Sequence, residues 1–110
     1  MIAKEYPTHI LIGSENQIFS TFLDEFEEQY STFKKRHIIL DLICFNNIKA
    51  SDINIFLKWT TKSKADKKSF IIVAQNVNID LVSEHISCVP TLIEAQDTLE
   101  MEAIERDLGF

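Results

Sequence analysis

The sequence of 110 residues contains little glycine, proline or cysteine, with only two of each. This scarcity excludes collagen-like, low-complexity and long linker segments, and it excludes a disulfide-rich scaffold. Basic residues are also few, because 11 Lys and Arg face 17 Asp and Glu and give a net charge of −6. The chain as a whole therefore lacks the basic character of nucleic-acid-binding proteins, and an anionic membrane would repel it on average.

Long hydrophobic runs are absent as well. The longest apolar runs have about five residues, whereas a membrane-spanning helix needs about 20. Residues 1–7 contain no apolar core of a secretory signal. Cys44 and Cys88 lack the spacing of a metal site, and we expect buried free thiols, although one Cys44–Cys88 bridge stays geometrically open. These features predict a cytoplasmic protein with no membrane association.

Apolar spacing along the chain predicts strands and helices in alternation. The predicted strands span residues 8–12, 37–42, 69–74 and 88–89, with a short edge strand at residues 5–6. The predicted helices span residues 16–35, a segment that begins at Ser51, residues 79–85 and residues 91–107. This alternation predicts one α/β domain over residues 1–110, with a mainly parallel or mixed sheet of four to five strands and about four helices.

The two long helices have distinct faces. Spacings of three and four place six apolar residues on one stripe of the first helix: Phe19, Phe22, Leu23, Phe26, Tyr30 and Phe33. We interpret this stripe as core rather than as a ligand pocket. The last helix begins with a capping-box pattern, Thr91 followed by Glu94, and most of its remaining side chains are acidic.

The order of these elements resembles that of a STAS domain, the fold of sulphate transporters and anti-sigma factor antagonists. The likeness covers roughly residues 8–105 and rests on Ile38–Leu42, the loop after it, the helix from Ser51, Phe70–Val73 and the final helix at Glu94 and Ala95. The resemblance implies a non-enzymatic protein-interaction module whose partner is an anti-sigma-type kinase or another regulator. A narrower resemblance is to short proteins of Bacteroidetes that are often named ribonuclease Z, through Val89–Leu92 and the tail Ile104–Phe110.

The name ribonuclease Z does not fit the residues. That enzyme holds two metals with a His-x-His-x-Asp-His cluster, and two-metal hydrolysis needs ligands fixed around both ions. This chain has only His9, His37 and His85, which are far apart in the sequence. We therefore expect no catalytic residue, no metal and no cofactor.

The STAS resemblance singles out the start of the second predicted helix. Ser51 falls at the hydroxyl that a cognate kinase phosphorylates in anti-sigma factor antagonists. Lys49 stands where the family has Asp, Ala50 at its first Ser, and Asp52 at its Gly. A phosphate here would add up to two negative charges to an interaction surface, which Lys49 would stabilise and Asp52 would oppose. The alternative is that Ser51 is simply the N-cap of the helix.

Three further features have two interpretations each. Trp59 is either an exposed anchor of an interface or partly buried against the sheet. The segment Lys62–Lys68 either touches RNA or is a solvated helix end. Asp41, inside an apolar strand, either has a shifted pKa or bonds the following loop at the end of its strand.

Two functions of different classes therefore remain. The first is a STAS-like interaction module with Ser51, Lys49 and Asp52 at its site and Trp59 as a candidate interface residue. The second is an accessory factor in RNA processing that has no nuclease activity of its own. The charge segregation, with residues 58–68 basic and both long helices acidic, also permits a homodimer.

Overall fold

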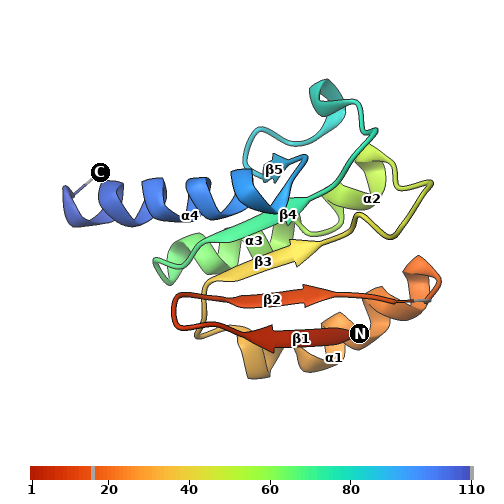
Figure 1. Ribbon diagram of the computed structural model, residues 1–110, viewed down its shortest axis with the longest axis horizontal. Helices are drawn as coiled ribbons and strands as arrows, with labels where there is room; N and C mark the ends of the chain where they lie inside the picture. Colours follow the sequence, from red (N-terminus) through yellow and green to blue (C-terminus); the bar gives the residue numbers. More distant parts are fainter. Residues whose placement is uncertain (16, 110) are drawn as a thin grey trace.

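A computed structural model describes residues 1–15 and 17–109 and contains one mixed sheet in the order β1-β2-β3-β4-β5 (Figure 1). The strands are β1 (Ile2–Glu5), β2 (Ile10–Gly13), β3 (Ile38–Asp41), β4 (Phe70–Val73) and β5 (Ser87–Val89). β1 pairs with β2 antiparallel, and the other neighbours pair parallel. The predicted α/β class with a mixed sheet is confirmed.

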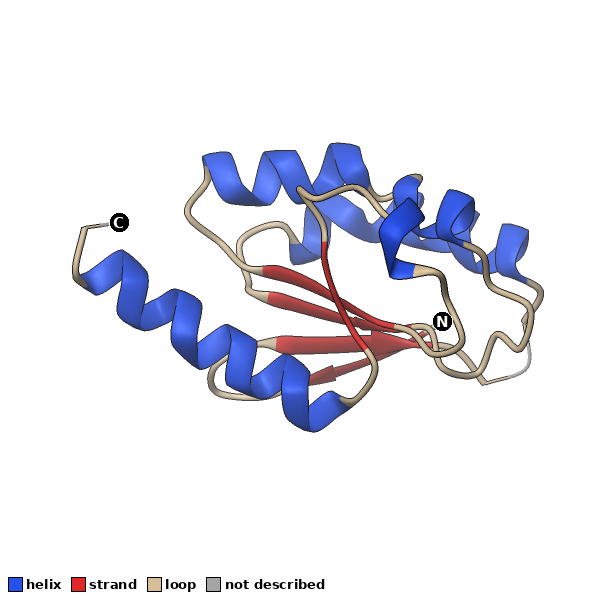
Figure 2. Cartoon of the chain, turned by 90° about the horizontal axis from the view of Figure 1, so that it is seen from above, coloured by secondary structure: helices blue, strands red, loops and turns tan. Residues whose placement is uncertain are grey.

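The helices form layers on both faces of this sheet (Figure 2). They are α1 (Phe19–Phe33), α2 (Ala50–Asn54), α3 (Leu57–Ala65) and α4 (Leu92–Asp107), with a 3₁₀ turn η1 (Ile79–Leu81). Because β2, β3 and β4 are parallel and adjacent in chain order, right-handed crossovers place α1 and α3 on the same face. α4 follows the last strand and packs on the opposite face.

An aromatic cluster fills the space between the sheet and the layer of α1 and α3. Phe22, Phe26, Tyr30 and Phe33 are buried, so the predicted stripe of α1 is core. The ring of Phe26 lies at its centre, with centroids 5.0 to 6.0 Å from four other rings: Tyr30, Phe56, Trp59 and Phe70. Mostly edge-on contacts of this kind add to the free energy gained by burying the rings.

Among the helices of the described residues, α4 is the one that covers the opposite face. Ala95 and Leu99 of this helix are buried against Ile39, Ile71 and Val73 of the central strands. Thr91 Oγ1 accepts a hydrogen bond from Glu94 N at 3.1 Å, which confirms the predicted helix start. Past the other end of the helix, Gly109 has a φ of +82°, a conformation that glycine adopts without strain.

The second predicted helix is in fact two helices. α2 ends at Asn54 and α3 begins at Leu57, and between them Phe56 has φ −80° and ψ 1°. This break lets Ile53, Phe56 and Trp59 all reach the core. Trp59 is 4% exposed, so it cannot be the exposed interface anchor that was one interpretation of the sequence.

The remaining differences concern short elements. β1 spans Ile2–Glu5 rather than residues 5–6, because a fully exposed edge strand needs no apolar alternation. The helix predicted at residues 79–85 is reduced to the three residues of η1, and α1 begins at Phe19. The predicted start at Asn16 and the last tail residue, Phe110, lie outside the described residues.

The position of Phe26 generates a stability prediction. Phe26→Ala removes the central ring and should lower the free energy of unfolding by about 3–5 kcal/mol. Ile79→Ala, a truncation at a side chain that is 55% exposed, is the matched control and should change it by less than about 1 kcal/mol. Urea unfolding followed by circular dichroism measures both, and equal losses in the two variants would contradict this account of the core.

Candidate functional site

The candidate site lies at the edge of the sheet where β2, β3, β4 and β5 end, which we call the carboxyl edge. Because the four strands are parallel, the loops that follow β3 and β4 meet there. In open α/β sheets, ligands bind outside the carboxyl ends of the strands. α2 follows β3 and η1 follows β4, and the two pack against each other at this edge.

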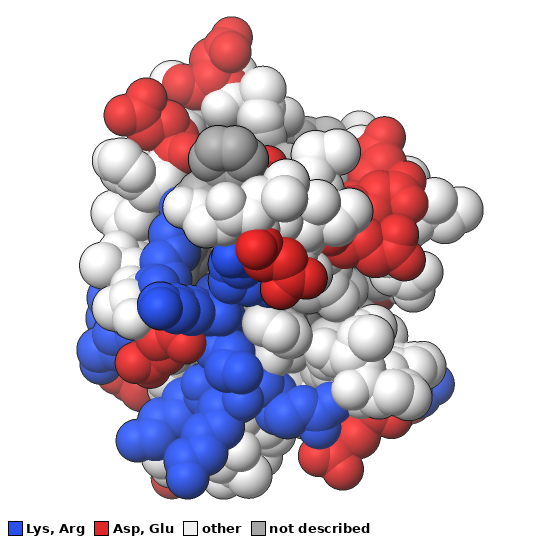
Figure 3. Space-filling view, turned by 90° about the vertical axis from the view of Figure 1, so that its left-hand side faces the viewer, with Lys and Arg blue, Asp and Glu red and all other residues white. Residues whose placement is uncertain are grey.

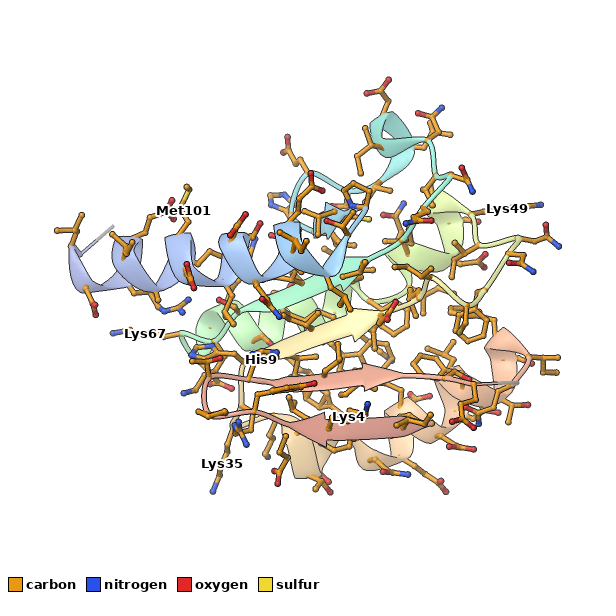
Figure 4. All side chains as sticks on the ribbon, in the orientation of Figure 1. Lys4, His9, Lys35, Lys49, Lys67 and Met101 are labelled. Carbon is orange, nitrogen blue, oxygen red and sulfur yellow. The ribbon has the colours of Figure 1, made fainter. Side chains whose placement is uncertain are left out.

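The start of α2 differs from the predicted N-cap. The helix begins at Ala50, and Lys49 is its N-cap, so Ser51 lies inside the first turn. Asp52 Oδ2 accepts a hydrogen bond from Lys49 N at 2.9 Å, whereas Ser51 as an N-cap would have accepted from a backbone N–H two or three residues further along the helix. Ser51 is exposed, and within the described part of the chain its hydroxyl makes no hydrogen bond. Lys49 points outward from the same turn (Figure 4).

Asn54 joins α2 to the segment after β4. Its Nδ2 donates to Leu81 O at 3.0 Å, and its Oδ1 accepts from Ser83 N at 2.7 Å. One side-chain amide therefore satisfies both a carbonyl and an N–H of the η1 segment. Asn78 Oδ1 in turn accepts from Asp80 N at 3.1 Å and begins the 3₁₀ turn. The two elements are thus held in one arrangement by directional bonds.

Exposed apolar side chains stand at the end of α2 and in η1, which contact each other. Ile55, the C-cap of α2, is 41% exposed and follows Ser51 by four residues, a spacing at which helical side chains are neighbours. Ile79 and Leu81 of η1 are 55% and 65% exposed. We call Ser51, Ile55, Ile79 and Leu81 the α2–η1 surface. It combines a free hydroxyl with aliphatic side chains on a braced backbone.

A hollow of about 500 Å³ adjoins this surface at Ile79. Its walls are mostly apolar, and Cys88 is the one thiol in them. Burial raises the pKa of the Cys88 thiol, which keeps it protonated and a poor nucleophile. Cys44 and Cys88 are both free, as expected, but Cys44 is exposed.

Asp41 bonds the loop that follows its own strand. Asp41 Oδ1 accepts from Ile43 N at 3.0 Å, so the strand-end interpretation of Asp41 is confirmed. Within residues 1–15 and 17–109, no three His, Cys, Asp or Glu side chains are grouped to hold a metal ion. The described side chains of the α2–η1 surface are suited to binding, because they present one hydroxyl and aliphatic groups with charges beside them.

A second cavity, of about 540 Å³, lies at the opposite edge between the β1–β2 turn and α4. His9 and His37 both line it. Burial and then the charge of Arg36 lower the pKa of His9. Burial, followed by Arg106 and Lys68, lowers the pKa of His37, against the opposing effect of Glu102. His37 Nδ1 accepts from Ser69 N at 3.0 Å, a bond that requires a neutral ring with its proton on Nε2.

No family model matches the sequence, and no curated protein is significantly similar to it. Of the helices in the described residues, none has the length and apolar character to cross a bilayer.

The sequence analysis found Lys49, Ser51 and Asp52 but missed the rest of the site. The sequence singled out none of Ile55, Ile79 and Leu81, which stand exposed at the break after α2 and in the short η1. Asn54 carried no signal, because its two partners lie 27 and 29 residues away in the chain.

The bridge through Asn54 generates a second prediction. Asn54→Asp keeps the acceptor for Ser83 N but replaces the donor to Leu81 O by an oxygen, so the two elements should separate more often. We expect a loss of about 1–2 kcal/mol in unfolding free energy and faster hydrogen exchange at the Ser83 amide. Asn47→Asp, in the exposed loop before α2, is the control. Unchanged exchange at Ser83 in Asn54→Asp would show that the bridge does not hold η1.

The lowered pKa of His37 generates a third prediction. The unfolded chain binds a proton at the ordinary value of 6.5, whereas the folded chain binds it only at lower pH. The contribution of His37 to the free energy of unfolding is therefore fully present above about pH 6.5 and is lost as the pH decreases below it. His37→Asn keeps an acceptor for Ser69 N and should make the fall between pH 7.5 and 5 smaller, as measured by urea unfolding. His85→Gln, at an exposed histidine, is the control variant, and a slope unchanged by His37→Asn would contradict the assignment.

Proposed function

We propose that this protein is a non-enzymatic interaction module that presents the α2–η1 surface to a protein partner and is controlled at Ser51. The observation that carries the proposal is the exposed Ser51 hydroxyl, unbonded among the described residues, one helical turn before the exposed Ile55 and on a helix that contacts η1 with its exposed Ile79 and Leu81. Aliphatic side chains on a braced backbone bind a partner at low entropic cost, because little has to be ordered on association.

The resemblance to STAS domains supports a kinase of the anti-sigma type as the partner. It places Ser51 at the family's modified hydroxyl, although Lys49, Ala50 and Asp52 depart from the residues the family has around it. Those departures alter the local charge and not the accessibility of the hydroxyl. An anti-sigma factor antagonist-type regulator is thus the specific form of the module that we propose.

Phosphorylation of Ser51 would act through charge. A phosphoserine adds about 1.5 to 2 negative charges at neutral pH. On Ser51 they would stand one helical turn from the aliphatic side chain of Ile55 and next to the carboxylate of Asp52. An apolar partner surface that covers Ile55 would have to desolvate this charge, which is unfavourable. We therefore infer that the unmodified protein binds the partner and that the phosphorylated protein releases it.

The fourth prediction tests this function with the full chain. Cross-linking in native extract identifies a partner, and calorimetry with the purified partner then compares wild type with variants. Ser51→Ala should bind as wild type does, whereas Ser51→Asp and Leu81→Arg should each weaken binding at least about tenfold, or 1.4 kcal/mol. Phosphate mapping of the protein from cells should locate the modification at Ser51.

Ser20→Asp introduces the same charge at an exposed serine of α1 and is the matched control. It should bind the partner as wild type does. The proposal is wrong if Ser51→Asp and Leu81→Arg both retain full affinity, or if the partner is captured equally well by every variant.

A further inference from the structure

The cationic side chains of this acidic protein gather at one end. Because α1, α3 and α4 run opposite to the parallel strands, their carboxyl ends meet at the edge where those strands begin (Figure 1). Eight of the 11 Lys and Arg residues lie at or just beyond these helix ends. We call them the basic end: the cations of Lys34–Arg36 and of Lys62–Lys68, together with Arg106. Figure 3 views the molecule from this end and shows the cations as a patch with acidic side chains mainly around it.

The basic end is one continuous surface. Lys34 of α1 and Lys62 of α3 line the same groove between these two helices. Four further cations surround a hollow of about 550 Å³ between α4 and the turn after α3: Lys64, Lys67, Lys68 and Arg106. Since α3 and its turn border both the groove and the hollow, the charges of three helix ends adjoin one another.

Most of this charge is unpaired within the molecule. Among the described residues, Arg36 is the one member of the basic end with a carboxylate within 4.0 Å, that of Glu5 at 3.3 Å. Lys35 and Lys67 extend away from the body of the molecule (Figure 4). The basic end therefore presents positive charge to a ligand from outside.

Helix dipoles account for only part of this concentration. A cation is stabilised in the last turn of a helix, and Lys62 and Lys64 occupy that turn in α3. Lys35, Lys67 and Lys68 lie beyond the helix ends, where the effect of the dipole has fallen off. The charge of these three side chains thus adds little to the stability of the fold.

Lys67 occupies a backbone position that suits glycine. Lys68 N donates to Ser63 O at 2.8 Å, and Lys67 N donates to Lys64 O at 3.0 Å, the two bonds of a Schellman motif. This motif places Lys67 in the left-handed region, with a φ of +59°. Glycine adopts this conformation without the steric strain that a β-carbon causes. A positive charge at the tip of this turn therefore lowers stability relative to glycine.

The chemistry of the basic end fits a phosphate backbone. Its cations are mostly lysines, which contact phosphates as point charges and read no base sequence. In residues 34–36 and 62–68, no large apolar side chain is exposed. The patch thus lacks the apolar centre of a protein interface, an apolar group for insertion into a bilayer and an aromatic platform for unpaired bases. A rigid duplex, which presents its phosphates and keeps its bases stacked, needs none of these.

We propose that the basic end binds the phosphate backbone of a nucleic-acid duplex without reading its sequence. RNA and DNA duplexes share this chemistry, and a DNA duplex carries one negative charge per about 1.7 Å of its axis. The molecule measures 31 by 24 Å across when seen from this end, so one duplex presents several phosphates to it at once. The α2–η1 surface lies at the other edge of the sheet, and this binding does not rest on the proposed function.

The net charge of −6 does not prevent such binding. The molecule is 40 Å long, whereas salt at physiological concentration screens charges beyond about 8 Å. The carboxylates that matter are therefore those beside the patch, such as Asp66 and the acidic residues of α4. Glu105 lines the same hollow as Lys67 and Lys68. A duplex accordingly lies across the ends of α1 and α3 and avoids α4.

The fifth prediction is measured by fluorescence anisotropy with the full chain and labelled RNA and DNA duplexes of about 20 base pairs. Both duplexes should bind, with a Kd of roughly 1–100 µM near physiological salt. Between about 50 and 200 mM KCl, log Kd should rise with log salt concentration with a slope of about 4, as four to five phosphate contacts require. Single-stranded poly(U) should bind more weakly, because the patch offers no stacking platform.

Neutralisation of two lysines locates the contact. Lys35→Gln with Lys67→Gln should weaken binding at least about tenfold at low salt and lower the slope by about 2. Lys4→Gln with Lys49→Gln is the matched control, because it removes the same charge at exposed positions away from the basic end (Figure 4). It should change the affinity less than about twofold.

Three single variants separate binding from folding and from the proposed function. Lys67→Gly removes a charge and relieves the left-handed backbone, so it should weaken binding while its melting temperature is no lower than that of wild type. Glu105→Gln should tighten binding, because it removes a carboxylate beside the patch. Ser51→Asp should bind the duplex as wild type does.

Three outcomes would overturn the proposal. One is the absence of binding to either duplex at about 50 mM salt. Another is an equal loss of affinity in the Lys35 and Lys67 variant and in the Lys4 and Lys49 variant. The third is tighter binding of poly(glutamate) or of phosphatidylglycerol vesicles than of a duplex, which would assign the basic end to an acidic protein or to a membrane.

Discussion

Burial of β3 and β4 on both faces is the constraint on which the rest of the structure depends. Ile38, Leu40, Phe70 and Ile72 point into the aromatic cluster, while Ile39, Ile71 and Val73 point toward α4. Strands with no solvated face need helices on each side. The aromatic stripe of α1 and the rings of Phe56 and Trp59 supply one layer, and a single helix supplies the other.

This arrangement leaves the two ends of the sheet free for different roles. At the carboxyl edge, the break between α2 and α3 turns Phe56 and Trp59 inward and leaves Ser51 and Ile55 outside. The amide of Asn54 then fixes η1 beside them. The same packing requirement that fills the core thus creates the surface that we propose for a partner.

At the opposite edge, the helix ends determine the electrostatics. α1 and α3 end there with lysines, and α4 passes the edge with its acidic and apolar faces exposed.

The sequence alone determined the α/β class, the buried strands and the aromatic stripe of α1, because these follow from the local spacing of apolar residues such as Phe22 and Phe26. It also singled out Ser51 as a candidate, because the order of the predicted elements resembles that of a STAS domain although the residues around Ser51 depart from the family's. Only the tertiary structure decided that Lys49 rather than Ser51 is the N-cap of α2, that Trp59 is buried, and that Asn54 binds residues far along the chain. It also brought the lysines of two helices and the acidic α4 to one end. Such contacts join distant segments, and periodicity within one segment contains no information about which segments meet.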